Sequence, residues 1–123
     1  SDVMVKSFVT VTGDQTVKEA AKLLLKGDTN HLPVIDKENR LSGIVTTYDI
    51  SKAFANDAQD ATIEEMMVKN VYTTTPDAPI DLAARILQQN NIGALVVVDA
   101  NRRVLGMLHS YDIGERVIRR ERK

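Results

Sequence analysis

The 123-residue sequence contains no cysteine and no tryptophan, and only 4% of its residues are aromatic. The lack of cysteine excludes disulfide bonds, thiolate metal sites and cysteine nucleophiles. It is compatible with a reducing compartment, and we expect a cytoplasmic protein. Apolar runs are short, since none approaches the roughly 18 residues that cross a bilayer, and the first residues have no signal-peptide pattern. We therefore expect a soluble protein without a membrane segment.

Neither sign of charge is in excess, because 16 basic residues stand against 17 acidic ones. Such a chain has no overall field that would hold nucleic acid or an anionic membrane. Basic residues gather only near the C-terminus, at Arg116, Arg119, Arg120, Arg122 and Lys123. We interpret this cluster as a solvated helix end, where positive charge is favourable beside the helix dipole. A nucleic-acid role would rest on this cluster alone, and we do not expect one.

The sequence does contain an internal repeat, in which one unit occurs twice. Residues 43–50, GIVTTYDI, align with residues 106–113, GMLHSYDI, at an offset of 63 residues. The same offset aligns MVK at residues 4–6 with MVK at residues 67–69. It also pairs further identical residues, namely Thr10 with Thr73, Thr12 with Thr75, Asp14 with Asp77, and Asp36 with Asp99. Because one constant offset aligns all of these residues, the chain contains two copies of one unit.

The repeat predicts the domain organisation. We place copy one at residues 1–59 and copy two at residues 64–123, with residues 60–63 as the end of a polar linker. A copy of this size has a small core, and a duplicated unit buries its apolar face against its twin. We therefore expect the copies to pack about a pseudo-twofold axis, with matching clefts at the seam.

Each copy is predicted to contain a strand, a helix, two strands and a second helix. In copy one, Thr16 and Glu19 have capping-box spacing at a helix start, and Gly27 suits the helix end. The expected core face of this helix is Val17, Ala20, Ala21 and Leu24. The other expected elements are a strand near 8–11, a hairpin of 32–35 with 41–46, and a helix at 47–55. Copy two repeats the plan, with a helix face of Ile80, Ala83, Ala84 and Leu87 and a strand at 94–98.

Thr46 and Asp49 place a hydroxyl and a carboxylate where a strand ends and a helix begins. A charged carboxylate accepts strong hydrogen bonds from two adjacent hydroxyls, so the pair suits a ribose diol. The same spacing is also a capping box, which requires no ligand. Asp112 recurs at the same place in copy two, although common ancestry of the copies also explains this recurrence. Both interpretations stay open on these residues alone.

These strings resemble a known family, the tandem cystathionine-β-synthase (CBS) motifs, whose paired form is called a Bateman module. The resemblance rests on MVK at the head of each copy, HLPVID at 31–36, GIVTTYDI at 43–50, and the second copies of each. Each string is weak by itself, but all occur in order, twice, over nearly the whole chain. The resemblance implies an α+β fold of two βαββα repeats packed sheet to sheet about a pseudo-twofold axis.

The resemblance also implies a regulatory ligand-binding module that is not an enzyme. Clefts in the family commonly take adenosine-containing effectors, which are AMP, ADP, ATP, S-adenosylmethionine or its thioether products such as methylthioadenosine. No further cofactor is implied. Each cleft is composite, because the ribose-binding Asp comes from one copy, whereas the first strand and the residues ahead of the hairpin come from the other.

Carried over residue by residue, the resemblance implies two unlike sites. Site one combines Thr46 and Asp49 with Val71, Tyr72, Thr73, Thr74, Thr75, Pro76, Gly93, Ala94 and Leu95. Gly93 and Ala94 stand where some members carry a basic residue that meets phosphate. Because burying an unpaired phosphate charge is costly, a thioether or sulfonium ligand suits site one better than a triphosphate.

Site two combines Asp112, His109 and Ser110 with Val9, Thr10, Val11, Thr12, Gly13, Asn30, His31, Leu32 and Pro33. It departs from the family pattern, because His109 stands where the hydroxyl residue is expected. We hypothesise that His31 and His109 border this site and give it a pH-dependent preference for anionic ligands. Two unrelated histidines are the alternative, and we expect no metal site without cysteine or a carboxylate cluster.

The expected partners follow from the same resemblance. Two modules would associate through their helices into a disc-like homodimer, and an effector domain or protein outside this chain would receive the conformational change. A start at Ser1 is compatible with a segment of a longer protein. The sequence has no nucleophile with its base, no phosphate-cradling glycine loop and no paired catalytic carboxylates, which argues against an enzyme. A structural dimerisation module with vestigial sites is the alternative.

Overall fold

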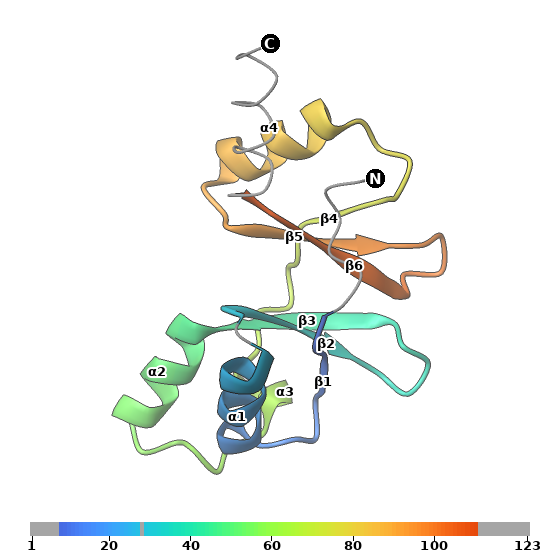
Figure 1. The fold of residues 1–123 in the computed structure, drawn as a ribbon. Helices are drawn as coiled ribbons and strands as arrows, with labels where there is room; N and C mark the ends of the chain where they lie inside the picture. The colour runs from blue at the N-terminus through green and yellow to red at the C-terminus, as the bar shows by residue number, and fades with distance from the viewer. Residues whose placement is uncertain (1–7, 28, 111–123) are drawn as a thin grey trace. The chain divides into compact units, whose positions relative to one another are not determined.

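A computed structural model of the chain describes residues 8–27 and 29–110 (Figure 1). The described residues divide into two compact units, residues 8–71 and residues 72–110. Each unit contains its own three-stranded mixed sheet and at least one helix, so the fold is α+β as predicted. Asp112 and the basic cluster at residues 116–123 lie outside the described residues.

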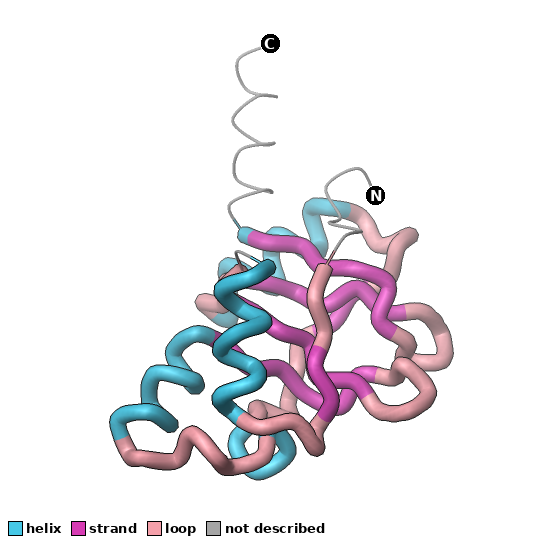
Figure 2. The backbone as a smooth tube through the Cα atoms, turned by 60° about the horizontal axis from the view of Figure 1, so that its bottom comes forward, coloured by secondary structure: helices cyan, strands magenta, loops and turns pink. Residues whose placement is uncertain are grey.

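The first unit contains a sheet in the order β1-β2-β3. Its elements are β1 (Val11–Thr12), α1 (Val17–Gly27), β2 (His31–Ile35), β3 (Leu41–Thr46), α2 (Thr47–Ala55) and α3 (Ile63–Met66). Strand β1 runs parallel to β2, and β2 runs antiparallel to β3. The predicted hairpin and both predicted helices are confirmed, and α1 lies beside α2 (Figure 2).

The start of α1 follows the predicted capping box. The backbone N–H of Thr16 donates to Glu19 Oε1 at 2.9 Å, and the N–H of Glu19 donates to Thr16 Oγ1 at 3.2 Å. These two bonds satisfy amides that a helix start otherwise leaves without partners. The helix then turns its apolar face inward, where Val17 and Ala20 are fully buried.

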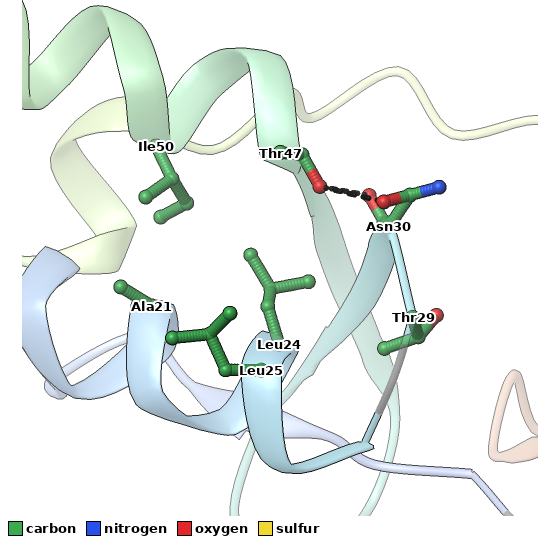
Figure 3. Close-up of a pocket in the computed structure, with 7 residues that line it drawn as sticks. All are labelled: Ala21, Leu24, Leu25, Thr29, Asn30, Thr47 and Ile50. Atoms are coloured by element: carbon green, nitrogen blue, oxygen red, sulfur yellow. Dashed lines mark hydrogen bonds between the residues drawn. The ribbon is translucent and has the colours of Figure 1, made fainter.

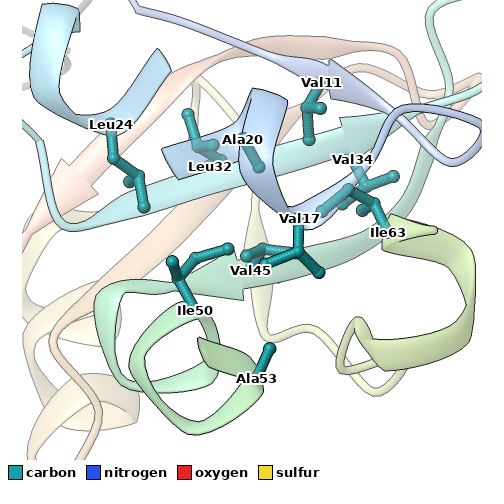
Figure 4. Close-up of a cluster of buried hydrophobic side chains, with 10 residues drawn as sticks. All are labelled: Val11, Val17, Ala20, Leu24, Leu32, Val34, Val45, Ile50, Ala53 and Ile63. Atoms are coloured by element: carbon teal, nitrogen blue, oxygen red, sulfur yellow. The ribbon is translucent and has the colours of Figure 1, made fainter. Parts of the chain in front are cut away.

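The core of the first unit lies between the sheet and its helices (Figure 4). It contains Val11, Val17, Ala20, Leu24, Leu32, Val34, Val45, Ile50, Ala53 and Ile63. Each fully buried Val, Leu or Ile side chain stabilises the unit by roughly 1.5–3 kcal/mol relative to exposure. Three of the four residues predicted for the α1 core face belong to this cluster, and Ala21 packs against it.

The segment after α2, which was predicted to be a short polar linker, is hydrogen-bonded to the start of α1. The carbonyls of Gln59 and Ala61 accept hydrogen bonds from the N–H groups of Lys18 and Val17, at 3.0 and 2.9 Å, so the segment caps α1. Ile63 is fully buried in the core. Backbone carbonyls of any residue type can cap a helix in this way, so the sequence pattern gives no signal for it. The repeat limits 1–59 and 64–123 stay a prediction.

The second unit contains a sheet in the order β4-β5-β6. Its elements are β4 (Thr73–Thr74), α4 (Ile80–Asn90), β5 (Ala94–Val98) and β6 (Val104–His109). Strand β4 runs parallel to β5, and β5 runs antiparallel to β6. Its core contains Ala83, Leu87, Leu95, Val97 and Leu108, with Ile80 and Ala84 packed against it. The predicted core face of α4 is therefore confirmed.

Candidate ligand-binding sites

Thr46 and Asp49 form a complete capping box at the start of α2. Asp49 Oδ2 accepts hydrogen bonds from the backbone N–H and from the hydroxyl of Thr46, both at 2.9 Å. Thr46 Oγ1 in turn accepts from the N–H of Asp49 at 3.3 Å. Both residues are half-buried. The helix-capping interpretation of this pair is therefore confirmed by the hydrogen bonds.

The cap does not use the whole Asp49 carboxylate. An ionised carboxylate has two oxygens and about four lone-pair positions. Both bonds from Thr46 go to Oδ2, and no residue within 8–27 or 29–110 donates to Oδ1. Helix capping and the binding of a ligand hydroxyl are thus compatible at Asp49. The cap also fixes the orientation in which Oδ1 is presented.

His31 lies directly across the sheet from Thr46, because the two residues are Cα partners in the β2–β3 register. The N–H of Thr47 donates to the carbonyl of Asn30 at 3.0 Å, so the neighbouring 30–47 pair is hydrogen-bonded. In an antiparallel ladder the next pair is then not hydrogen-bonded, and its side chains lie closer together. The structure thus brings His31, which was predicted for site two, beside Thr46 of site one.

The same strand pair in the second unit carries different residues. Ala94 and His109 are the Cα partners there, and Ser110 donates its N–H to the carbonyl of Gly93 at 2.9 Å. His109 is buried, with 8% of its surface exposed. It takes the register position that Thr46 has in the first unit. Asp112, predicted to act beside it, lies outside the described residues.

The first strands bring a further pair of carboxylates next to the predicted sites. Thr12 Oγ1 donates to Asp14 Oδ1 at 2.5 Å, and Thr75 Oγ1 donates to Asp77 Oδ1 at 2.8 Å. The hydrogen bond from Thr75, with one from the backbone of Asp77 itself, lowers the pKa of the Asp77 carboxyl below its usual value. Neither Asp residue was among the predicted site residues, although the Thr-x-Asp spacing occurs in both copies.

The structure groups the remaining predicted residues by unit. In the first unit, β1 pairs with β2, which places residues 11–12 and 31–33 of predicted site two in one sheet. In the second unit, β4 pairs with β5, which places residues 73–74 and 94–95 of predicted site one in one sheet. Thr46 and Asp49 belong to the first unit, and His109 and Ser110 belong to the second. The assembly of these groups into two composite sites stays a prediction.

A pocket of about 360 Å³ opens on the helical side of the first unit (Figure 3). It is lined by Ala21, Leu24, Leu25, Thr29, Asn30, Thr47 and Ile50. At its polar edge, Thr47 Oγ1 donates to Asn30 Oδ1 at 3.1 Å. Of these residues only Asn30 was predicted for a ligand site. Neither Thr46 nor Asp49 lines the pocket, so it is separate from the hydroxyl–carboxylate pair.

Within residues 8–27 and 29–110, no group of three or more His, Cys, Asp or Glu side chains is arranged to hold a metal ion. None of the helices in these ranges is long and apolar enough to cross a membrane.

Two sequence repeats that share the order strand, helix, strand, strand within the described residues define a tandem α+β module. The family model of the CBS domain matches residues 1–56 and residues 63–118. The chain therefore belongs to the CBS domain family, and it carries two CBS domains.

Solved structures of CBS domain pairs are similar along nearly the whole chain. The CBS domain pair of protein MJ0100, solved in complex with 5′-methylthioadenosine and S-adenosyl-L-methionine, is 39% identical with a TM-score of 0.88. The match covers 97% of this chain and 94% of that one. The AMP complex of CBSX2 is 24% identical with a TM-score of 0.86, covers 98% and 96% of the two chains, and supports the fold alone.

Curated relatives are longer proteins. A homoserine O-acetyltransferase of Methanohalobium evestigatum is 40% identical over 113 residues, which is 92% of this chain and 23% of the relative. An L-aspartate semialdehyde sulfurtransferase of Methanosarcina acetivorans is 42% identical over 119 residues, which is 97% of this chain and 24% of the relative. The chain thus spans about a quarter of the length of these relatives.

Proposed function

We propose that this chain is a regulatory module that binds an adenosyl thioether or sulfonium compound, with methylthioadenosine and S-adenosylmethionine as the leading candidates. The observation that carries the proposal is its similarity to the MJ0100 domain pair, which was solved with both compounds. The preoriented Asp49 carboxylate, with Oδ1 unused by the described residues, supports the proposal from the chemistry of the site.

Asp49 is the proposed ribose-binding residue. Its Oδ1 would accept hydrogen bonds from the 2′- and 3′-hydroxyls, which are strong because the acceptor is charged. Thr46 would contribute indirectly, since its two bonds hold Oδ2 and so fix the carboxylate plane. The proposal assigns Val71–Pro76 and Gly93–Leu95 to the same ligand, as predicted site one has them.

The charge distribution favours a ligand without phosphates at this proposed site. Gly93 and Ala94 offer no cation, and Asp77 places a carboxylate two residues from Thr75. The Asp77 carboxyl is ionised at neutral pH, as an ordinary aspartate is, and this charge disfavours a second anion nearby. A neutral thioether avoids this repulsion, and a sulfonium cation is attracted. AMP, ADP and ATP are therefore expected to bind more weakly.

The proposed site two combines Asp112 with His109, Ser110 and the first-unit residues at 9–13 and 30–33. Its asymmetry with site one supports a difference in ligand preference between the sites. His109 offers a ring nitrogen at the register position where Thr46 offers a hydroxyl. We expect site two to bind ribose more weakly, because an imidazole at this position does not reproduce the Thr46–Asp49 cap.

Regulation follows if ligand binding changes the populations of two conformations of the module. A ligand achieves this only through different affinities for the two conformations. The output would go to an enzyme domain or partner, since the relatives named above are enzymes of which this stretch is about a quarter. Homoserine and S-adenosylmethionine share a four-carbon amino-acid skeleton, so feedback by such an effector is chemically reasonable. A homodimer of modules is part of the same proposal.

Isothermal titration calorimetry with methylthioadenosine, S-adenosylmethionine, AMP and ATP tests the proposal. Asp49→Asn keeps an amide oxygen for the cap but removes the charge, so affinity should fall by about ten- to a hundredfold. Glu19→Gln is the matched control, because it alters the capping box of α1, which belongs to neither proposed site. Asp112→Asn should cost less than Asp49→Asn. An equal or larger loss for Asp112→Asn would reverse our ranking of the two sites.

A structural dimerisation module with vestigial sites is the second candidate, favoured by His109 in the position of the hydroxyl residue. A thermal-shift panel separates the two functions, because a ligand that binds only the folded state raises the unfolding midpoint. No shift with any of the four compounds at millimolar concentration would support the structural function and reject the sensor.

A further inference from the structure

Gly43, in the middle of β3, is a point of very close approach between two segments. A Cβ atom at this position would lie 2.7 Å from Met67 Sδ and 2.8 Å from the backbone oxygen of Val68. Separations below 3.0 Å essentially do not occur for real Cβ atoms. The methionine side chain can move, but the Val68 oxygen belongs to the backbone. Only glycine admits the Met67–Val68 segment at this distance.

The segment that Gly43 admits is hydrogen-bonded along the edge of β3. The N–H of Ile44 donates to the Val68 carbonyl at 2.9 Å, and the N–H of Val68 donates to the Ile44 carbonyl at 3.0 Å. Among the backbone hydrogen bonds between this segment and the first unit, the Ile44–Val68 pair lies furthest along the chain. Further along the chain, the carbonyl of Tyr72 accepts from the N–H of Val96 at 3.3 Å in the second unit. Residues 69–71 therefore connect an attachment in one unit with an attachment in the other.

Strand β3 thus has two roles in the same unit. At its C-terminal end it presents Thr46, which orients Asp49. At its edge it holds Val68, from which the chain continues into the residues that predicted site one takes from 71–76. The two positions on β3, Gly43 and Thr46, are three residues apart.

We propose that Gly43 is a positioning residue for the adenosyl ligand, and this inference rests on the proposed function. By keeping Val68 on β3, Gly43 limits the free connection between the units to residues 69–71. A short connection raises the effective concentration of the second-unit ligand residues at Asp49. A short linker between two binding groups raises their avidity for the same reason. No atom of Gly43 contacts the ligand in this scheme.

Gly43→Ala is expected to displace Met67 and Val68 and to break the reciprocal bonds with Ile44. The free connection would then lengthen to residues 67–71, since Ile63 stays fixed in the core. Ligand binding would have to order two more residues, which costs conformational entropy. We expect the affinity for methylthioadenosine to fall by about ten- to a hundredfold.

A second variant reaches the same bonds without touching β3. Val68→Pro removes the N–H that donates to Ile44, and Met67 already has φ −65° and ψ 153°, which suits a residue before proline. It should reproduce the loss of affinity seen with Gly43→Ala. This variant keeps the test valid if Gly43→Ala fails to fold.

Gly27→Ala is the matched control. A Cβ there would lie 2.7 Å from Val9 Cγ2, which is the same overlap in the same unit, but with the end of a side chain. Hydrogen exchange without ligand should accelerate at residues 67–72 in Gly43→Ala and Val68→Pro and stay unchanged at Asp49. Gly27→Ala should leave this exchange unchanged. Because Val9 belongs to predicted site two, the affinity control is the part of methylthioadenosine binding that Asp49→Asn removes, which Gly27→Ala should also leave unchanged.

The outcomes separate this inference from the proposed function. Weaker binding together with faster exchange at 67–72, in both variants and not in the control, supports the positioning role. Unchanged binding or unchanged exchange in the variants, beside a wild-type chain that binds, overturns the positioning role alone. A wild-type chain that binds no adenosyl compound overturns both.

Discussion

The pair of strands that precedes α2 carries His31 opposite Thr46, whereas the matching pair in the second unit carries Ala94 opposite His109. Each unit therefore has one histidine at this pair, but the histidines are on opposite strands. Thr46 starts a complete capping box with Asp49, and His109 has no hydroxyl with which to do the same. The two units thus differ at a strand pair that carries predicted ligand residues.

The hairpins of the two units are alike in detail. Asp36 Oδ1 accepts from the N–H groups of Glu38 and Arg40, both at 2.9 Å. Asp99 Oδ1 accepts from the N–H groups of Asn101 and Arg103, also at 2.9 Å. Both hairpins have a register shift near the same point of the first strand. The duplication has kept the bonds that set turns and register, and it has changed the side chains at the strand ends.

Ile63→Ala should have the largest effect on stability. This residue is fully buried in the first-unit core, on the segment that caps α1. Removing its side chain leaves a cavity, so the free energy of unfolding should fall by about 2–5 kcal/mol. Urea denaturation measures the change. Leu82→Ala, at a residue that is 45% exposed, is the control and should cost less than about 0.5 kcal/mol. Similar losses of unfolding free energy in both variants would contradict the placement of Ile63 in the first-unit core.

His109→Thr would give the second unit the residue that the first unit has at the same register position. If the hydroxyl is what site two lacks, methylthioadenosine should bind there about tenfold more tightly, because a charge-assisted cap can form. Calorimetric stoichiometry and affinity measure the gain. His31→Ala, which copies Ala94 into the first unit, is the companion variant. If His31→Ala raised the affinity as much as His109→Thr, the missing hydroxyl at position 109 would not explain the weaker binding at site two.

The pH-dependence hypothesis for site two is tested on the same proteins. Affinity for AMP should rise as the pH falls from about 8 to 5.5, since imidazole gains a proton in this range. His109→Thr should flatten this response. A flat response in the wild-type chain would refute the hypothesis.

Thr75→Val should have the smallest effect. Its hydroxyl lowers the pKa of Asp77, so the valine variant should return that pKa toward the ordinary value of 3.8. A lowered pKa stabilises the folded state above the unfolded-state pKa, and this contribution is lost as the pH falls through the lowered value. The stability of wild type and variant should therefore converge at low pH. An NMR titration of Asp77 measures the shift. An unchanged Asp77 pKa in the variant would contradict the Thr75 hydrogen bond as its cause.

The local features of the fold were predictable from sequence. The capping box at Thr16 and Glu19, the hairpins and the core faces of α1 and α4 are set by residues a few positions apart, and the repeat is visible by direct alignment of the two copies. The pair of Thr46 and Asp49 was also identified, along with its helix-capping alternative. The structure adds that no residue within 8–27 or 29–110 donates to Asp49 Oδ1 once the cap is made, which the spacing alone does not reveal.

Other features depended on the path of the chain. The sequence predicts residues 60–63 as the end of a polar linker and residues 64–68 as the start of copy two, whereas the structure groups all of them with the first unit. The close approach of Gly43 to Met67 joins positions 24 residues apart. The pairing of His31 with Thr46 required the strand register, and the pocket beside Asn30 required α1 and α2 to be placed together.

The sequence by itself determined the duplication, the order of elements and the residues that each helix buries, because these depend on periodicity and on hydrogen bonds between near neighbours. Only the tertiary structure decided that residues 57–68 belong to the first unit and that β3 is both the carrier of Thr46 and the support of Val68. Contacts of this kind join backbone groups that any residue can supply, so side-chain identity does not encode them. Glycine at position 43 is the exception, because there the absence of a side chain is itself the requirement.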